Sequence, residues 1–319
     1  MSAAIETHQL TKDFPVGFWR RRPYRALDAL NLEVTPGEVF GFLGPNGAGK
    51  TTTLKLLMQL IYPTTGSATI LGRPVGDLEV RRRIGYLPEN PYFYDYLTAE
   101  ELLEYFAGLF GYTRAERRTR VARLLDEVGL GAERRLQLRK FSKGMIQRVG
   151  IAQALLNDPE VVFLDEPMSG LDPLGRRDIR SLILRLRDRG CTVFFSSHIL
   201  SDAETLCSRV GIIAGGRLAA SGRLSDMLAY EVRGWELVVG NVSVSTLERF
   251  ASLATRITPV SENRCTIELP NTASPAAIIP ELAAVGATIV SLNPLHTTLE
   301  EIFVRKVQAA ASARTGALS

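Results

Sequence analysis

The sequence predicts an α/β fold followed by a smaller α+β domain, and three patterns carry this prediction. A glycine-rich loop at residues 44–51 lies between an apolar strand at 38–43 and a helical stretch at 52–58. A second apolar run, 161–164, has the short continuous hydrophobicity of a strand buried on both faces of a parallel sheet. After residue 234 the expected order becomes strand, helix, strand, strand, helix, strand, which is typical of a ferredoxin-like domain.

The glycine-rich loop has the composition of a phosphate-binding site. It fits the pattern G-x-x-x-x-G-K-[ST] and leads directly into a helix at Thr52. Its residues are Gly44, Pro45, Asn46, Gly47, Ala48, Gly49, Lys50 and Thr51. Backbone N–H groups with no Cβ in the way can surround a polyphosphate, and the helix N-terminus adds the positive end of its dipole. In such a loop Lys50 reaches the β- and γ-phosphates and the Thr51 hydroxyl holds Mg²⁺. The flanking strand and helix argue against a chance match.

Two carboxylates, Asp165 and Glu166, directly follow the second apolar run. Ligands of open α/β sheets bind at the edge where the strands end. We therefore expect Asp165 to meet the Mg²⁺ shell and Glu166 to polarise an attacking water. Two solvated acids at a strand end are the ordinary alternative, and the glycine-rich loop favours the functional interpretation.

Three further segments give the chain its resemblance to the ATP-binding cassette (ABC) family. Residues 141–148, FSKGMIQR, are similar to the family signature, usually L-S-G-G-Q. Residues 169–173, SGLDP, are similar to its D-loop, and His198 stands where the family has its switch histidine. Alone, these segments would indicate helix caps, a turn and a solvated histidine. With the loop and the acidic strand, they form five motifs in family order across residues 4–225.

The resemblance implies a fold, two cofactors and a mode of assembly. The fold is a P-loop NTPase cassette with a RecA-like core, an antiparallel β-subdomain and a helical subdomain at about residues 90–155. The cofactors are ATP and Mg²⁺, and Glu166 and His198 are the implied catalytic residues. Two copies are expected to pair head to tail, so that Ser142, Gly144 and Asp172 act in trans on the partner's nucleotide.

Two motifs depart from the family pattern. The signature has Lys143 and Met145 where glycine and glutamine are common. The segment 85–89 resembles the family's Q-loop but carries Glu89 in place of glutamine. A carboxylate can contact Mg²⁺ or water, but it donates a hydrogen bond only when protonated. We therefore count Glu89 among the expected metal-site residues, together with Thr51 and Asp165.

An aromatic side chain is expected to stack on adenine near the N-terminus. Phe14 is the first choice, because residues 10–14 match the family segment. An apparent insertion at residues 15–24 offers the alternatives Phe18, Trp19 and Tyr24. Its basic run at residues 20–22 indicates a solvated loop tip, with anionic lipid contact as the less favoured interpretation.

Composition limits the functions that the chain can have. Its 319 residues carry a net charge of +4, a mild excess that does not call for nucleic acid. No apolar stretch reaches the ~18 residues of a membrane span, and we expect no signal peptide. The three cysteines, Cys191, Cys207 and Cys265, are scattered and suggest free thiols in a reducing cytosol rather than a metal knuckle.

We expect three parts along the chain: a cassette at residues 1–228, an accessory α+β domain at 229–308 and a disordered tail at 309–319. The accessory domain includes a helix expected at 244–253. Its layout resembles that of ABC ATPases that pair with ABC-2-type permeases.

The expected function is therefore that of an ATP-hydrolysing subunit working with a separate permease at the cytoplasmic face of the inner membrane. Soluble ABC ATPases of the DNA-repair or ribosome type are the alternative. They usually show a long coiled coil, zinc cysteines or two fused cassettes, and this sequence shows none of these. A P-loop kinase is a further alternative, but that class of protein does not predict the Ser142-x-Gly144 pattern or His198.

Overall fold

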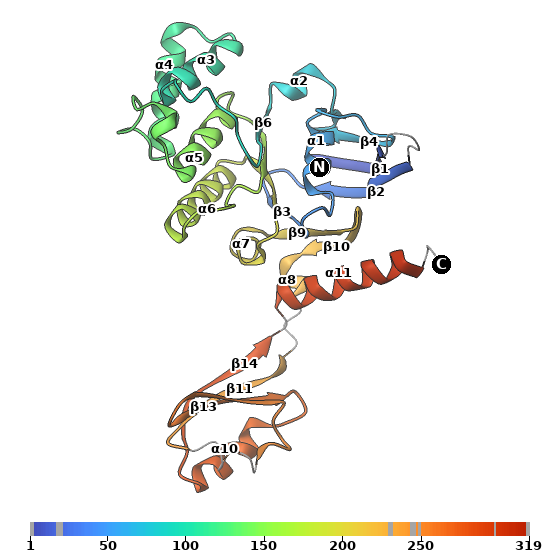
Figure 1. Cartoon of the computed structure of the whole chain (residues 1–319), viewed down its shortest axis with the longest axis vertical. Helices are drawn as coiled ribbons and strands as arrows, with labels where there is room; N and C mark the ends of the chain where they lie inside the picture. Colours follow the sequence, from blue (N-terminus) through green and yellow to red (C-terminus); the bar gives the residue numbers. More distant parts are fainter. Residues whose placement is uncertain are drawn as a thin grey trace. The chain divides into compact units, whose positions relative to one another are not determined.

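The computed structural model divides the chain into two compact units (Figure 1). The first contains the chain up to Leu224 and the segment from Phe303 on, and the second is Ser225–Ile302. The break lies close to the one expected at residue 228. The residues that the structure describes are 3–16, 22–228, 232–242, 247, 250–296 and 298–316.

An antiparallel sheet begins the first unit, with strand order β2-β1-β4-β5. Its strands are β1 (Ile5–Val16), β2 (Arg22–Val34), β4 (Thr65–Ile70) and β5 (Arg73–Pro74). The insertion expected at residues 15–24 extends the β1–β2 hairpin, since Phe14 pairs with Tyr24 and Val16 with Arg22. Phe18 and Trp19 lie outside the described residues.

The central sheet has the order β10-β9-β3-β8-β7-β6, and only β10 pairs in the antiparallel sense. Its strands are β3 (Val39–Leu43), β6 (Ile84–Leu87), β7 (Val161–Asp165), β8 (Thr192–Ser197), β9 (Arg209–Ala214) and β10 (Arg217–Arg223). Every residue of β3, β7 and β8 is buried, as their continuous apolar runs predicted. Three phenylalanine rings from adjacent strands pack side by side on this sheet. The Phe194 ring centroid lies 5.6 Å from that of Phe40 and 5.8 Å from that of Phe163.

Helices connect and flank these strands. They are α1 (Lys50–Leu57), α2 (Leu78–Arg81), α6 (Pro173–Asp188), α7 (Leu200–Leu206) and α8 (Leu224–Met227). Because β3, β7 and β8 are parallel neighbours, the segments that follow them start at one edge of the sheet. This edge holds the glycine-rich loop, Glu166 and His198.

A helical block contains α3 (Ala99–Leu109), α4 (Arg114–Glu127) and α5 (Lys143–Ala154). Thr98 and Glu101 form a capping box at the start of α3, and Thr113 and Glu116 form another at the start of α4. Figure 1 shows this block (green) and the antiparallel sheet (blue) on opposite sides of the central sheet.

The second unit has a four-stranded sheet of order β12-β13-β11-β14 in which all neighbours are antiparallel. Its elements are β11 (Val232–Gly240), β12 (Arg256–Ser261), β13 (Arg264–Pro270), α10 (Pro275–Ala284) and β14 (Thr288–His296). This strand order is that of the expected ferredoxin-like domain. Half of the residues expected to form a helix at 244–253 lie outside the described residues.

The last helix, α11 (Leu299–Gly316), corrects two expectations about the C-terminus. The second unit ends at Ile302 instead of residue 308, and residues 309–316 are helical instead of disordered. The reason is local: four of the five residues at 309–313 are alanine, which has the highest intrinsic helix propensity.

Candidate functional site

The glycine-rich loop joins β3 to α1, and its shape requires glycine at two positions. Gly49 has φ +112°, and a Cβ there would lie 2.8 Å from the carbonyl oxygen of Ala26. At Gly44 a Cβ would lie 2.6 Å from the carbonyl oxygen of Ile213. Gly49 is also the N-cap of α1, so the loop ends at the positive end of that helix.

Lys50, the first residue of α1, points back under the loop. Its Nζ donates to the Gly44 carbonyl at 2.7 Å and lies 3.1 Å from Oε1 of Glu166. The Lys50 and Glu166 side chains are only 6% and 7% exposed. The site therefore holds a shielded cation beside the loop N–H groups, as binding of a polyphosphate requires.

Glu166 occupies a left-handed conformation with φ +49°, which is unusual for a residue with a Cβ. Its N–H donates to Oγ of Ser196, at 3.0 Å, and this bond supports the turn. Its Oε2 lies 2.8 Å from Nδ1 of His198. The Glu166 carboxylate thus lies between Lys50 and His198.

Asp165 faces a different set of partners, although it is adjacent in sequence. Its Oδ1 accepts from the Ser196 hydroxyl at 2.6 Å and from the Thr51 hydroxyl at 3.3 Å. Burial raises the pKa of this carboxyl, while the two hydroxyl donors oppose the shift and the charges of Glu89 and Glu166 add to it.

These residues fit Mg²⁺. The Oδ2 atom of Asp165 is buried and has no hydrogen-bond partner among the described residues. The other oxygen, Oδ1, accepts from the Thr51 hydroxyl, so the carboxylate and this hydroxyl provide hard oxygen ligands side by side. No group of three or more His, Cys, Asp or Glu side chains in the described part of the chain could hold a metal alone. Mg²⁺ usually keeps several waters and takes substrate phosphate as a ligand, so it needs few protein groups.

A pocket of about 440 Å³ lies over the loop and collects most of the predicted residues. Its lining comprises Phe14, Tyr24, Ala26, Pro45, Asn46, Gly47, Gly49, Lys50, Thr51, Thr52, Glu89, Glu166, Ser169 and His198. Both described aromatic candidates, Phe14 and Tyr24, are therefore in the wall. Gly44, Ala48 and Asp165 belong to the same site but do not line the pocket.

Two lining residues and one support were not predicted from the sequence. Ala26 and Ser169 line the pocket, and Ser196 on β8 donates to the Asp165 carboxylate and accepts from the Glu166 N–H. Ser196 could have been found as the polar end of a buried strand next to His198. Ala26 has no such signal, since its place depends on the register of β1 and β2.

The residues expected to act in trans form a separate cluster. Ser142 caps α5 by accepting from the Met145 N–H at 3.3 Å, and Asp172 caps α6 by accepting from the Gly175 N–H at 2.8 Å. With Gly144 they line a second pocket of about 360 Å³. A single chain does not bring these three residues to Lys50.

The chain is similar in sequence to known ABC transporter ATP-binding proteins. The ABC transporter family model matches residues 27–169. An uncharacterized ABC transporter ATP-binding protein of Synechocystis sp. is 44% identical over 306 residues, which are 95% of this chain and 84% of the relative. The bacitracin transport ATP-binding protein BcrA of Bacillus licheniformis is 44% identical over 221 residues, covering 68% of this chain and 69% of BcrA.

Two solved structures are similar to the first unit. An ATP-binding subunit of an ABC transporter has a TM-score of 0.61 at 34% identity, covering 70% of this chain and 91% of that one. A dimeric ATP-binding cassette in a post-hydrolysis state with ADP and Pi has a TM-score of 0.63 at 28% identity, covering 69% and 98%. The chain therefore belongs to the ABC transporter family as an ATP-binding, ATP-hydrolysing subunit.

Proposed function

We propose that two copies of this chain bind Mg²⁺ and ATP at the glycine-rich loop, and that hydrolysis there powers transport through a separate ABC-2-type permease. One observation carries the proposal: the Glu166 carboxylate contacts both Lys50 and His198 beside the glycine-rich loop, and Asp165 accepts a hydrogen bond from Thr51. This is a site for holding and cleaving a polyphosphate.

Nucleotide binding follows from the lining of the pocket. The loop N–H groups and Lys50 hold the β- and γ-phosphates, and the dipole of α1 adds to their attraction. Phe14 stacks on adenine at the hairpin end of the pocket, where Tyr24 is its cross-strand neighbour.

Hydrolysis depends on the placement of Glu166 and His198. Phosphoryl transfer needs mainly positioning and charge stabilisation. Glu166 polarises the attacking water and accepts its proton. His198 contacts the Glu166 carboxylate at 2.8 Å and can orient it toward the γ-phosphate. Thr51 and Asp165 hold Mg²⁺, with Glu89 nearby. When bound, the ion neutralises charge that develops on the phosphates.

The second pocket gives the reason for dimerisation. Ser142, Gly144 and Asp172 gather at the ends of α5 and α6 but lie outside the loop pocket. In a head-to-tail dimer they complete the partner's site, with Ser142 and the Gly144 N–H on the γ-phosphate. Dimeric cassettes among the structural relatives support this arrangement.

The permease proposal rests on the names of the relatives and on the layout of the second unit, which resembles that of ABC ATPases that pair with ABC-2-type permeases. BcrA is named as a bacitracin transport protein, and a relative from Escherichia coli, 36% identical over 227 residues, as a probable multidrug ABC transporter protein. No helix in the described ranges has the length and hydropathy to cross a membrane. We propose that the permease holds the chain at the cytoplasmic face of the inner membrane.

Lys50→Ala tests the binding site directly, with Lys55→Ala as the matched control. Both lysines belong to α1, but Lys55 is exposed and does not line the pocket. We expect ATP affinity, measured by titration calorimetry, to fall more than tenfold in Lys50→Ala, a loss above ~1.4 kcal/mol. Lys55→Ala should bind like the wild type. Affinity within threefold of wild type in a folded Lys50→Ala protein would refute the proposed site.

A further inference from the structure

We propose that Arg25 is a positioning residue for the nucleotide base: its guanidinium clamps the β1–β2 hairpin across a β-bulge and so fixes the wall that carries Phe14 and Tyr24. The inference rests on the proposed function, because it takes the pocket over the glycine-rich loop as the nucleotide site. Arg25 does not line that pocket and acts through the hairpin.

The β1–β2 hairpin contains a β-bulge at the point where the hairpin reaches the pocket. Lys12 pairs with Leu27 and Asp13 pairs with Arg25, so Ala26 is the extra residue. Such an extra residue bends the strand and raises its local twist. Leu27 is fully buried in the sheet, whereas Ala26 and Tyr24 line the pocket. The bulge therefore divides the hairpin into two arms: a sheet arm, which packs in the antiparallel sheet, and a wall arm, which forms the wall of the pocket.

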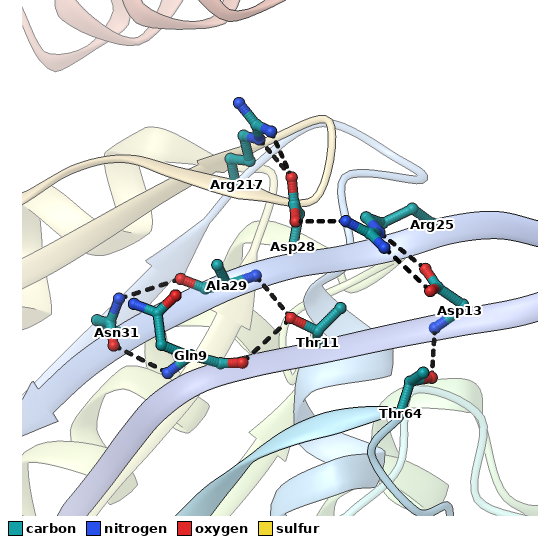
Figure 2. A network of polar contacts seen from close by, with 9 residues as sticks. All are labelled: Gln9, Thr11, Asp13, Arg25, Asp28, Ala29, Asn31, Thr64 and Arg217. Carbon is teal, nitrogen blue, oxygen red and sulfur yellow. Dashed lines mark hydrogen bonds and ion pairs between the residues drawn. The ribbon is translucent and has the colours of Figure 1, made fainter.

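Arg25 joins these two arms (Figure 2). Its Nε and Nη2 donate to the two carboxylate oxygens of Asp13, at 2.9 and 3.1 Å, in a bidentate pair. Its Nη1 donates to Asp28 on the sheet side of the bulge at 3.1 Å. One planar guanidinium thus holds a carboxylate on each side of the bend, which a lysine ammonium cannot reproduce with the same geometry.

Asp28 in turn fixes the clamp to the glycine-rich loop. Its Oδ2 accepts from Nε of Arg217 on β10 at 2.6 Å, and its N–H donates to the Gly216 carbonyl at 2.8 Å. The Gly216 N–H donates to the carbonyl of Ala48, in the loop itself, at 2.9 Å. A continuous set of hydrogen bonds therefore runs from Asp13 to the phosphate-binding loop.

Strand alternation explains how the clamp reaches the base. Successive side chains of a strand point to opposite faces. The cross-strand pair Asp13–Arg25 is followed by the pair Phe14–Tyr24, and only the second pair lines the pocket. The Asp13–Arg25 pair on one face of the hairpin thus sets the position of Phe14 and Tyr24 on the other face.

The test separates the base from the phosphates. Arg25→Met keeps the length and the apolar stem of the side chain and removes the guanidinium. We expect its Kd for ATP to rise about tenfold, while its Kd for inorganic tripolyphosphate stays within twofold of wild type. In steady-state hydrolysis the KM for ATP should rise with little change in kcat, because uniform binding has been lost.

Arg73→Met is the matched control. Arg73 belongs to the same sheet, its side chain is 53% exposed against 54% for Arg25, and it pairs with a single carboxylate, Asp77. It does not line the pocket, and both affinities should stay at wild-type values. Arg25→Lys, which keeps the charge without the fork, should give an ATP affinity between those of Arg25→Met and the wild type.

Two results would overturn the clamp. One is ATP affinity of Arg25→Met within twofold of wild type, and the other is a parallel loss of ATP and tripolyphosphate affinity. If Arg25→Met fails to fold, Asp28→Asn carries the same test, since it weakens the anchor to Arg217 and Arg25. Failure of the proposed function itself would look different: tripolyphosphate would bind the wild type and Lys50→Ala equally well.

Discussion

At the scale of single residues, Asp165 and Glu166 show how two adjacent carboxylates acquire separate surroundings. The left-handed backbone at Glu166 costs about 1–3 kcal/mol for a residue with a Cβ. It turns Glu166 toward Lys50 and His198, while Asp165 stays with Thr51. We infer that the first carboxylate serves the attacking water and the second the metal.

Glu89 is the site residue that departs from the family pattern, and Glu89→Gln tests what its charge does. It lines the pocket, and its charge raises the pKa of the Asp165 carboxyl. We expect basal ATP hydrolysis within about threefold of wild type, because the amide keeps the size of the side chain and can still coordinate. Steady-state rates across a Mg²⁺ titration would measure this.

The control for Glu89→Gln is Glu79→Gln, at an exposed acid in α2 that does not line the pocket. A collapse of hydrolysis in Glu89→Gln alone would mean that the chain relies on a carboxylate for its metal or water contacts.

The residues that could be predicted from sequence are those whose spacing within one segment defines their chemistry. The loop from Gly44 to Thr51 is such a segment, and the acids after β7 are another. Ser196 and Ala26 could not be predicted in the same way. Their contacts arise from β-strand register between segments far apart in the chain.

At the scale of elements, an ion pair between a half-buried arginine and a fully buried aspartate joins α6 to α7. Asp202, in the first turn of α7, is fully buried, and its Oδ1 accepts from Nε of Arg180 on α6 at 3.0 Å. α6 begins after the Asp172 cap and α7 after His198, so the pair connects the helices that follow two motif segments.

Arg180→Ala should destabilise the first unit strongly, since it leaves a buried carboxylate without its partner. Loss of one member of a fully buried pair typically costs about 3–5 kcal/mol, and we expect a smaller loss here because the Arg180 side chain is 29% exposed. Arg187→Ala, on the same helix, removes only a pair with the exposed Asp188 and should cost less than ~1 kcal/mol. Urea unfolding of both variants measures the difference, and equal midpoints would show that the α6–α7 pair contributes little.

The elements also show where sequence patterns mislead. Small residues at 309–313 suggested disorder, but alanine favours helix, and α11 continues through them. The helical subdomain was expected from about residue 90, and its first helix, α3, begins at Ala99, directly after the Thr98 cap. The capping residue therefore locates the start of the helix.

At the scale of the whole molecule, exposed tyrosines of α3 and of the segment before it form an aromatic surface, and we propose that the permease docks there. Tyr94, Tyr96 and Tyr105 are exposed, and their rings are in contact: the Tyr94 centroid lies 5.9 Å from that of Tyr96 in a tilted pair and 6.4 Å from that of Tyr105 in an edge-on pair. Phe93 and Leu97, in the same segment, are half-buried. Exposed aromatic clusters of this kind are typical of helix-in-groove recognition.

Combined Tyr94→Glu and Tyr96→Glu substitution should release the protein from membranes that contain the co-expressed permease, with basal ATP hydrolysis unchanged. Tyr62→Glu, at an exposed tyrosine far from this cluster in sequence, should leave membrane association intact. Membrane pelleting of the wild type in a permease-free strain would contradict the docking surface. Loss of hydrolysis in the double variant would contradict it too.

The central claim is that two copies of this chain close around ATP and that Glu166 then drives its hydrolysis. Glu166→Gln tests it most directly, because the amide keeps the size of the side chain but cannot act as a base. It also removes a negative charge facing the γ-phosphate. In size-exclusion chromatography with ATP and Mg²⁺, we predict that this variant elutes as a dimer of the 35.1 kDa chain and shows no turnover. A variant that stays monomeric with ATP, or that hydrolyses ATP near the wild-type rate, would contradict the account.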